Sequence, residues 1–404
     1  MSQSILKLFH LQGVGVSLRD WDIVGQEIIL KLRDRSPSIC PYCQQKTAHR
    51  HERGRWRKLY HGFGFGWKVY LLLRKSRFYC STCRKSFTKA FPLIIPWQRR
   101  TVGAERQIVE SLRGRSFKSV AEKEGISYGI SRRLLMRRLN PERLAWEETR
   151  DTGQAIGIDA HSFRGSQMVN TITDLSARRP LTILPDSRKG TLNRFLMNMP
   201  EEKKQNVQEV CIDMDHLLLS SVEKYLPGAR VVVDHFHVIQ DANRRVDEAR
   251  KIEQDAWKVE IPRRIFLVGK EKLTLAQRKK VEAYGQKYPS LKEFYWMKEA
   301  LRNFYRLSCK KTAEKRLRDL VAMTRLSEDA AMVQWGRTLK RWGPYILNYF
   351  DHRTTNAYTE GIHTKIKMIK RISFGFRNVQ IYVRKVLLAI FPLAVILSSP
   401  HFSS

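Results

Sequence analysis

The sequence predicts a multidomain α/β protein, in which two small N-terminal modules precede a mixed α/β domain that an all-helical segment interrupts. Three observations predict it. Two Cys-x-x-Cys pairs lie between Cys40 and Cys83, a helical pattern follows from Val102, and strand-like apolar runs alternate with helix-like runs after Gln154. A chain of 404 residues also exceeds what one hydrophobic core usually serves, so more than one domain is expected.

The charge of the chain predicts a polyanionic partner. Lysine and arginine number 75 against 39 acidic residues, which gives a formal net charge of +36. Such a surplus attracts nucleic acid, and DNA is the partner we expect. An anionic membrane is the alternative, but no run of about 18 apolar residues is present to span a bilayer, and no membrane partner is expected. The longest apolar run, Val386 to Leu397, contains Pro392 and is expected to form a buried final element.

The cysteines predict a zinc site. The first residues lack the pattern of a secretory signal, so we expect a cytoplasmic, nucleoid-associated protein, in which cysteines favour metal ligation or burial over disulfides. Four thiolates from Cys40, Cys43, Cys80 and Cys83 suit a closed tetrahedral Zn²⁺ site. Four buried free thiols are the alternative, which the polar, turn-forming surroundings disfavour. We expect a structural zinc ribbon that binds DNA, binds protein or folds its own domain.

Residues 102–139 predict three helices with the spacing of a helix-turn-helix. Ala121 permits close contact between helices, and Gly125 lies four residues later, where a sharp turn is needed. Ser127 is a candidate N-cap of the third helix. An ordinary helical hairpin with a solvated basic face is the alternative. The arginines of the third helix that would face DNA are Arg132, Arg133, Arg137 and Arg138.

The next part of the chain predicts a mixed sheet. After a polar linker over residues 142–154, the runs AIGIDA, MVNTITDL and RPLTILPD predict three successive strands, and VQEVCIDM and RVVVDHF predict two more, separated by helical segments. A three-strand meander followed by alternating helices and strands is the order of an RNase-H-like fold. The charged helical segment that follows is expected to be an insertion, with a core formed by Trp257, Trp296, Trp335 and Trp342.

Three carboxylates are the candidates for chemistry. Asp159 ends the first strand, Asp213 ends the fourth, and Glu360 lies on a late helix. The first strand is expected at the centre of the sheet with the fourth beside it, which brings both aspartates to one edge. Carboxylates that hold two Mg²⁺ (or Mn²⁺) ions about 3.5–4 Å apart stabilise the charges that develop in phosphodiester cleavage. The pattern therefore predicts a metal-dependent site that acts on DNA.

Other acids compete for the second position. An aspartate at a strand end is commonly a turn or helix-cap residue. Asp215 is able to cap the following helix, and Asp234 ends the fifth strand at the same edge, so both are rivals of Asp213. Asp234 is otherwise expected to be an auxiliary ligand or a structural residue. His235 and His237 are expected on the surface or in packing, with a DNA contact left open.

Glu360 lies on a predicted helix face that also carries donors suited to phosphate. The positions on this face recur at steps of three and four residues, so they share one side of the helix. Lys367 is expected to contact the DNA backbone near the scissile bond. The other members of the face are Asn356, His363 and Thr364.

These features resemble the ISL3 family of bacterial insertion-sequence transposases over nearly the whole chain. The resemblance rests on the double Cys-x-x-Cys module, the helix-turn-helix, the segments Ile156–Asp159 and Phe163–Gly165, and the run VVVDHFHV. Its most specific part is Glu360–Asn378 with Asn356 before it.

Such proteins are DDE-type recombinases with an RNase-H-like fold, so the resemblance implies Asp159, Asp213 and Glu360 as the metal-binding triad. Ala160 departs from the family, in which this position is often acidic. Because that acid does not belong to the triad, we expect activity to survive.

We expect a DNA transposase that binds the terminal inverted repeats of its element, cuts with water at the triad and joins the freed 3′ hydroxyl to target DNA. Two ends are processed together, so a homodimer on DNA is expected. Arg371 and Arg377 are expected to add nonspecific phosphate contacts. The alternatives are a zinc-dependent helix-turn-helix regulator without catalysis and an RNase-H-like nuclease without joining activity. The expected domains are a zinc-ribbon domain at 1–98, a helix-turn-helix domain at 99–141, the first part of the catalytic core at 142–240, the helical insertion at 241–350 and the C-terminal part of the core at 351–404.

Overall fold

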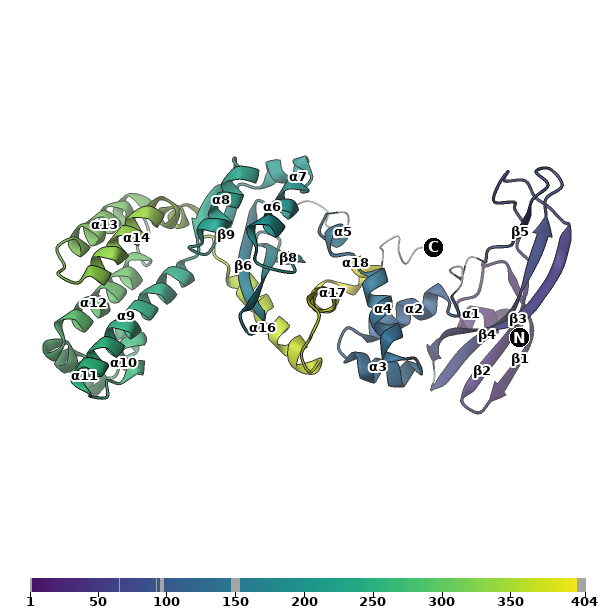
Figure 1. Ribbon diagram of the computed structural model, residues 1–404, viewed down its shortest axis with the longest axis horizontal. Coiled ribbons are helices and arrows are strands. Elements are labelled where there is room, and N and C mark those ends of the chain that lie inside the picture. The colour runs from purple at the N-terminus through teal and green to yellow at the C-terminus, as the bar shows by residue number, and fades with distance from the viewer. Residues whose placement is uncertain (1, 65, 92, 95–97, 147–152, 398–404) are drawn as a thin grey trace. The chain divides into compact units, whose positions relative to one another are not determined.

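The computed structural model describes residues 2–64, 66–91, 93–94, 98–146 and 153–397 of the chain (Figure 1). The chain forms two compact units. The terminal unit comprises Met1–Pro141 and Ile366–Ser404, and the central unit comprises Glu142–Lys365. Sequence reasoning assigned residues 351–404 as a whole to the catalytic core, whereas the structure places their part from Ile366 onward in the terminal unit.

A five-stranded sheet forms the first part of the terminal unit. Its strand order is β1-β2-β4-β3, and β5 pairs with β4. The strand pair expected within the first 38 residues is confirmed, because β1 and β2 pair antiparallel. Leu30, Leu32, Leu59 and Leu71 are fully buried in the core of the sheet. The elements are α1 (Ser2–Leu8), β1 (Val16–Val24), β2 (Glu27–Asp34), β3 (Arg50–Gly64), β4 (Trp67–Tyr79) and β5 (Ser86–Thr88).

Irregularities in the strand register bend this sheet, and two of them bear on its arginines. The register of β1 against β2 shifts between Leu18 and Asp20, which leaves Arg19 without a partner in the ladder. The register of β3 against β4 shifts between Arg53 and Trp56. A Cβ atom on Gly54 would lie 1.7 Å from the carbonyl oxygen of Lys75, so only glycine fits there. Bulges of this kind increase the local twist and redirect the side chains beside them.

Three helices follow, α2 (Val102–Ser111), α3 (Phe117–Glu124) and α4 (Tyr128–Arg138), in the positions expected from the sequence. Gly125 adopts φ of 64° at the end of α3, which accounts for the glycine at this turn. Ser127 occupies the N-cap position of α4, but its side chain makes no capping hydrogen bond. The expected N-cap residue is therefore confirmed in its position, without a hydrogen bond from its side chain.

The end of the chain packs on these helices. The long apolar run forms α17 (Val379–Ile390) and α18 (Leu393–Leu397), and Pro392 lies between them. Val386, Leu387 and Leu388 are fully buried, which confirms a buried final element. α17 contacts α4, and Arg384 donates a hydrogen bond to the carbonyl oxygen of Leu139. Among the described residues, no helix is both long and apolar enough to cross a membrane.

The central unit contains a second five-stranded sheet with the order β10-β9-β6-β7-β8. β6, β7 and β8 form an antiparallel meander, and β9 and β10 run parallel to β6. The pairing of the first strand with the fourth is thus confirmed. The strands are β6 (Ala155–Arg164), β7 (Gln167–Asp174), β8 (Arg179–Ile183), β9 (Glu209–Ile212) and β10 (Arg230–Val233).

The segment expected to be a linker begins instead with α5 (Pro141–Trp146). Ala145 is fully buried, and the Trp146 ring stacks on Phe195 at 4.6 Å. Ala145 and Trp146 thus pack against the fold, although most residues of the segment are polar and predicted a linker. Residues 147–152 of the expected linker lie outside the described part of the chain.

Helices cover the second sheet and extend from it. α6 packs with α8, and Figure 1 shows α9 running from the sheet into a group formed by α10 to α14. Trp335 and Trp342 are buried in this group, but Trp257 is 61% exposed and Trp296 is 42% exposed. The expected four-tryptophan core is therefore correct for two members only. The helices are α6 (Lys189–Met197), α7 (Glu201–Asn206), α8 (His216–Tyr225), α9 (His235–Trp257), α10 (Arg263–Leu267), η1 (Lys270–Lys272), α11 (Leu275–Lys287), α12 (Pro289–Phe304), α13 (Lys310–Thr324), α14 (Ala330–Leu347), α15 (Tyr349–His352) and α16 (Ala357–Ile372).

Candidate active site and zinc site

The four cysteines of the two Cys-x-x-Cys pairs converge in the terminal unit. The Sγ atoms of Cys40 and Cys83 lie 3.5 Å apart, as do those of Cys43 and Cys80, and all four lie within 4.8 Å of one another. In a tetrahedral site with Zn–S distances of about 2.3 Å, neighbouring sulfur atoms lie about 3.8 Å apart. The cluster therefore has the dimensions of a structural zinc site.

The two cysteine pairs have the same backbone structure. The Cys40 amide donates to the carbonyl oxygen of Gln45, and the Cys80 amide donates to that of Lys85, both at 2.9 Å. The residue after each pair has positive φ, 60° at Gln44 and 54° at Arg84. Each turn thus directs two thiols to one side, as the spacing predicted.

In the central unit, the start of α16 packs across β6. Asn356, directly before this helix, is fully buried, and its side-chain amide donates to the carbonyl oxygen of Ile158 at 3.4 Å. The hydroxyls of Thr359 and Thr173 lie 2.7 Å apart. A Cβ atom on Gly157 would lie 2.4 Å from Asn356 Oδ1. A glycine at this point of β6 therefore lets the helix approach the strand closely.

This packing brings four carboxylates from four elements toward one place. Asp159 belongs to β6, Asp213 follows β9, Asp234 follows β10, and Glu360 lies in the first turn of α16. Ligand atoms of Asp159, Asp213 and His237 lie within 4.8 Å of one another. Those of Asp234, His237 and Glu360 do so as well. We refer to these residues as the acid cluster.

His237 is the member of the acid cluster whose place sequence reasoning missed. Its Nε2 lies 2.9 Å from Asp213 Oδ1 and 3.9 Å from Asp159 Oδ1. The run VVVDHFHV contained the signal, because α9 starts directly after β10 and its first turn carries His237 toward the sheet edge. His235 instead packs against the rings of Tyr305 and Tyr349, in agreement with the packing role expected for it.

The electrostatics of the acid cluster favour a bound cation. Burial raises the pKa of Asp159 to about 7, and the charges of Asp213, Asp234 and Glu360 contribute to the rise. Burial alone would lower the pKa of His237, but its hydrogen bond to Asp213 and the nearby acids raise it to about 9. Burial also raises the pKa of Glu360. Positive charge at this place relieves repulsion between the carboxylates.

The oxygen atoms of the acid cluster fit a divalent metal ion. Asp234 Oδ2 and Glu360 Oε1 are buried, and neither has a hydrogen-bond partner among the described residues. Buried polar atoms without partners are rare, and an ion is one explanation for them. Carboxylate oxygens are the ligands that Mg²⁺ prefers. The donor set therefore suits Mg²⁺ or Mn²⁺.

Of the two rivals of Asp213, only Asp234 lies in the acid cluster. Asp215 caps α8, since its carboxylate accepts a hydrogen bond from the Leu217 amide at 2.6 Å. This is the capping role that the sequence offered for it. Asp234 also caps a helix, because its Oδ1 accepts from the Phe236 amide at 3.3 Å, which leaves Oδ2 for another ligand.

A hydroxyl on β7 and an imidazole on each of β6 and α16 form a linked group beside Asp159. Thr171 is paired with Asp159 across β6 and β7. Its Oγ1 lies 2.9 Å from His161 Nδ1 and 3.0 Å from His363 Nε2. His363 Nδ1 is 3.5 Å from Asp159 Oδ2. His363, which was expected to face phosphate, thus lies beside the first aspartate.

The residues expected to contact DNA fall into exposed and buried groups. Arg138 is only 5% exposed, and its guanidinium forms an ion pair with the fully buried Glu105 at 2.7 Å. Arg137 also pairs with Glu105, and Asn356 is buried as described above. The buried side chains of Arg138 and Asn356 therefore stabilise the fold. The accessible members of the set are Arg132, Arg133, Arg137, Lys367, Arg371 and Arg377, of which Arg132 is half-buried.

Comparison with known proteins identifies relatives of this chain. Residues 156–386 match the ISL3-type DDE transposase family, and residues 36–83 match the zinc-finger of transposase IS204/IS1001/IS1096/IS1165. The chain is 22% identical over 389 residues to the transposase for insertion sequence element IS1001 of Bordetella parapertussis, which covers 93% of this chain and 95% of the relative. It is 23% identical over 412 residues to the transposase for IS1557 of Mycobacterium tuberculosis, covering 91% and 89%.

These matches confirm the expected resemblance, including the zinc ribbon. The transposase match alone extends over more than half of the chain. The protein therefore belongs to the ISL3 family of DDE transposases.

Proposed function

We propose that this DNA transposase binds the terminal inverted repeats of its insertion sequence and cuts and joins DNA at the acid cluster. The observation that carries the proposal is the approach of Asp159, Asp213 and Glu360, which lie far apart in the sequence, to the shared neighbour His237. A structural role alone does not explain why buried acids gather with unpartnered oxygens.

The topology of the central unit supports an RNase-H-like catalytic core. Numbered along the chain, the strands have the spatial order 5-4-1-2-3, with a meander on one side of the first strand and parallel strands on the other. The helices from α9 to α15 stand between the fifth strand and the helix of Glu360. They correspond to the proposed insertion.

Asp159 and Asp213 are proposed to hold one Mg²⁺ or Mn²⁺ ion, and Glu360 to complete a second site with Asp234 as an auxiliary ligand. Two such ions, when bound, supply an activated nucleophile and stabilise charge on the leaving oxygen. His237, 2.9 Å from Asp213, fixes the direction of that carboxylate. His363 does the same for Asp159.

The proposed chemistry consists of two displacements at phosphorus. In the first, a water oxygen bonds to phosphorus, the bond to the 3′ oxygen breaks, and that oxygen takes a proton. In the second, the freed 3′ hydroxyl loses its proton and bonds to the phosphorus of a target phosphodiester, while the bond from that phosphorus to the target's 3′ oxygen breaks and this oxygen takes a proton. The acid cluster is able to serve both, because each step needs the same stabilisation of the attacking and leaving oxygens.

DNA binding is proposed for the terminal unit. α2, α3 and α4 would act as a helix-turn-helix, in which Arg132 and Arg133 contact DNA while Glu105 fixes the position of Arg137 and Arg138. Lys367, Arg371 and Arg377 would contact phosphates. The four cysteines would hold a structural Zn²⁺ ion. Because two ends are joined, a homodimer on DNA is part of the proposal.

The test compares Asp213→Ala with the matched variant Asp215→Ala in a cleavage assay with Mg²⁺ and labelled duplexes that carry the element ends. Asp215 lies two residues away but caps a helix, so its loss should cost stability of about 1 kcal/mol without removing the chemistry. We expect nicked and joined products from the wild type and Asp215→Ala, and none from Asp213→Ala. Equal products from all three proteins would refute the role of Asp213. Nicks without joined products would identify a nuclease.

A further inference from the structure

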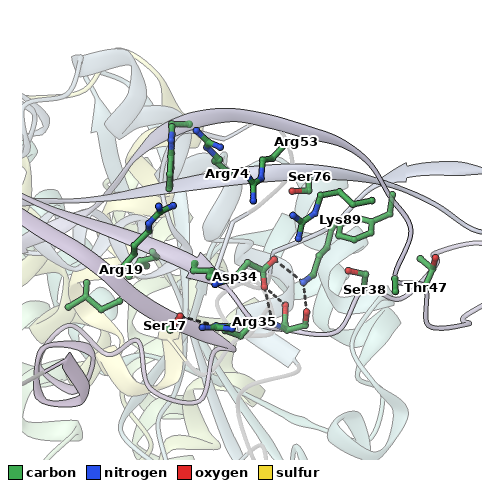
Figure 2. Close-up of a pocket in the computed structure, with 18 residues that line it drawn as sticks. Ser17, Arg19, Asp34, Arg35, Ser38, Thr47, Arg53, Arg74, Ser76 and Lys89 are labelled. Carbon is green, nitrogen blue, oxygen red and sulfur yellow. Dashed lines mark hydrogen bonds and ion pairs between the residues drawn. The ribbon is translucent and has the colours of Figure 1, made fainter.

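A basic groove opens in the first sheet, where its two strand pairs separate. β2 and β4 are paired only up to Lys31 and Leu72, and beyond this point β1 and β2 diverge from β3 and β4. The space between them has a volume of about 730 Å³. Each of the four strands contributes an arginine to its lining, namely Arg19, Arg33, Arg53 and Arg74. Figure 2 labels Arg19, Arg53 and Arg74 among the residues of this lining.

The charge of this groove is not neutralised within the protein. Asp34 is the one carboxylate among the described residues that line it. That carboxylate is already paired with Lys89 at 2.9 Å and accepts hydrogen bonds from the amide and hydroxyl of Ser36, as Figure 2 shows. Within the described part of the chain, none of the four arginines forms an ion pair with a carboxylate. The groove therefore presents a cluster of uncompensated guanidinium groups.

The fold fixes the backbone of two of these arginines and the guanidinium of a third. Arg19 is the bulged residue of β1, and Arg53 lies at the edge of the β3 bulge that requires Gly54. The guanidinium of Arg74 stacks on the ring of its cross-strand partner Trp56, 4.6 Å from the ring centre. Residues placed in this way lose less side-chain freedom when they bind a ligand. Solvated arginines on a flat strand would lack such support.

We propose that this groove binds the phosphate backbone of DNA, as a contact of the terminal unit separate from α4. The guanidinium fork matches phosphate oxygens in a bidentate manner, and four such groups around one space suit consecutive charges on a backbone. The lining is mostly polar and basic, which favours contacts with the backbone over contacts with base edges, so the contact is expected to be independent of sequence. The inference rests on the proposed DNA-binding function and adds a site to it.

The test uses two double variants of the full chain that remove equal charge from one sheet. Arg33→Ala/Arg74→Ala removes two groove arginines. Arg57→Ala/Arg77→Ala removes two exposed arginines that do not line the groove, because Arg57 pairs with Leu73 and points away from Trp56 and Arg74. Binding to a duplex with the element ends, and to a scrambled duplex, is measured without Mg²⁺ over a range of salt concentrations.

The groove variant is expected to bind both duplexes more weakly by similar factors, and its plot of log affinity against log salt should be shallower by about 2. The control variant should keep the wild-type slope, and Arg33→Lys/Arg74→Lys should restore most of it because the charges remain. Unchanged zinc content and thermal midpoint show that the fold is intact. An unaltered slope in the groove variant, or an equal change in the control, overturns the proposal.

The DNA-binding test of the groove is independent of the catalytic proposal. The binding measurements contain no Mg²⁺ and use variants of the terminal unit only, so they do not depend on the role of Asp213, which belongs to the central unit. If Asp213→Ala still cuts DNA, the catalytic proposal fails while the groove test stands. If the groove variants bind like the wild type while Asp213→Ala is inactive, only the groove proposal fails.

Discussion

The two units of this transposase differ in how they treat buried charge. In the terminal unit, buried Glu105 lies against Arg137 and Arg138, and buried Lys385 donates to the carbonyl oxygens of Leu112 and Arg115. In the central unit, the acid cluster holds carboxylates whose neighbours are mostly other carboxylates. Partnered charges indicate a structural role, whereas a group of like charges that the protein compensates only in part, here through His237, indicates a place for an external cation.

The largest expected effect follows from replacing an acid of the cluster without changing its shape. Asp159→Asn should reduce strand cleavage by three orders of magnitude or more, on the order of the losses seen when one member of a cooperating set is removed. The same change should raise the thermal midpoint of the protein above pH 7 without added Mg²⁺. The reason is that burial and the neighbouring acids raise the pKa of Asp159 to about 7, so its ionised form costs stability.

The stability gain of Asp159→Asn has a defined pH dependence. The folded pKa lies above the ordinary value, so the wild type loses stability as pH rises from about 4 to about 7, whereas the asparagine variant does not. The two curves should therefore separate as pH rises and run parallel above pH 8. A variant that loses both activity and stability at pH 8 would show that Asp159 is structural, which contradicts the comparison drawn above.

A second, smaller effect is expected in the terminal unit. Glu105→Gln removes the charge that compensates Arg138, which is only 5% exposed, so unfolding should become easier by about 3 kcal/mol. The matched control is Glu110→Gln on the same helix, whose partner Arg106 is largely exposed. That change should cost at most a few tenths of a kcal/mol. Denaturant unfolding measures both, and equal costs for the two variants would contradict a structural role for Glu105.

Sequence reasoning predicted those parts that depend on local spacing. The cysteine pairs fix their own turns, so Cys40, Cys43, Cys80 and Cys83 converge as expected. Asp159 and Asp213 were chosen because each was expected to end a strand. This is correct for Asp213, which follows β9, but Asp159 lies inside β6, which continues to Arg164. The parallel pairing of β6 with β9 nevertheless brings the two residues together. In both cases a short stretch of chain contains the whole signal.

The remaining parts depend on contacts between distant segments. Asp234 was expected at this edge of the sheet as a rival of Asp213 or an auxiliary ligand, but the place of His237 also depends on β10 lying beside β9 and on α9 starting directly after β10. Arg138 was expected to face DNA, but the side of α4 that turns inward is set by Glu105, which lies 33 positions earlier. The prediction that Trp257 and Trp296 are buried failed for the same reason. A helical pattern shows which residues share a face, but not whether a neighbouring helix covers that face.

The smallest effect concerns Lys385 and tests whether a buried charge with only carbonyl partners behaves as a structural one. Burial lowers the pKa of Lys385 from 10.5 to about 8. Between these values the unfolded chain binds more protons than the folded one, so stability should rise with pH, by at most about 1.4 kcal/mol per pH unit. Lys385→Met removes this group and keeps a long unbranched side chain. The difference in unfolding free energy between wild type and variant should be constant below pH 7 and should change in favour of the wild type from pH 8 to pH 10. A constant difference over the whole range would mean that Lys385 does not titrate as a buried group, and that the terminal unit admits water to this charge.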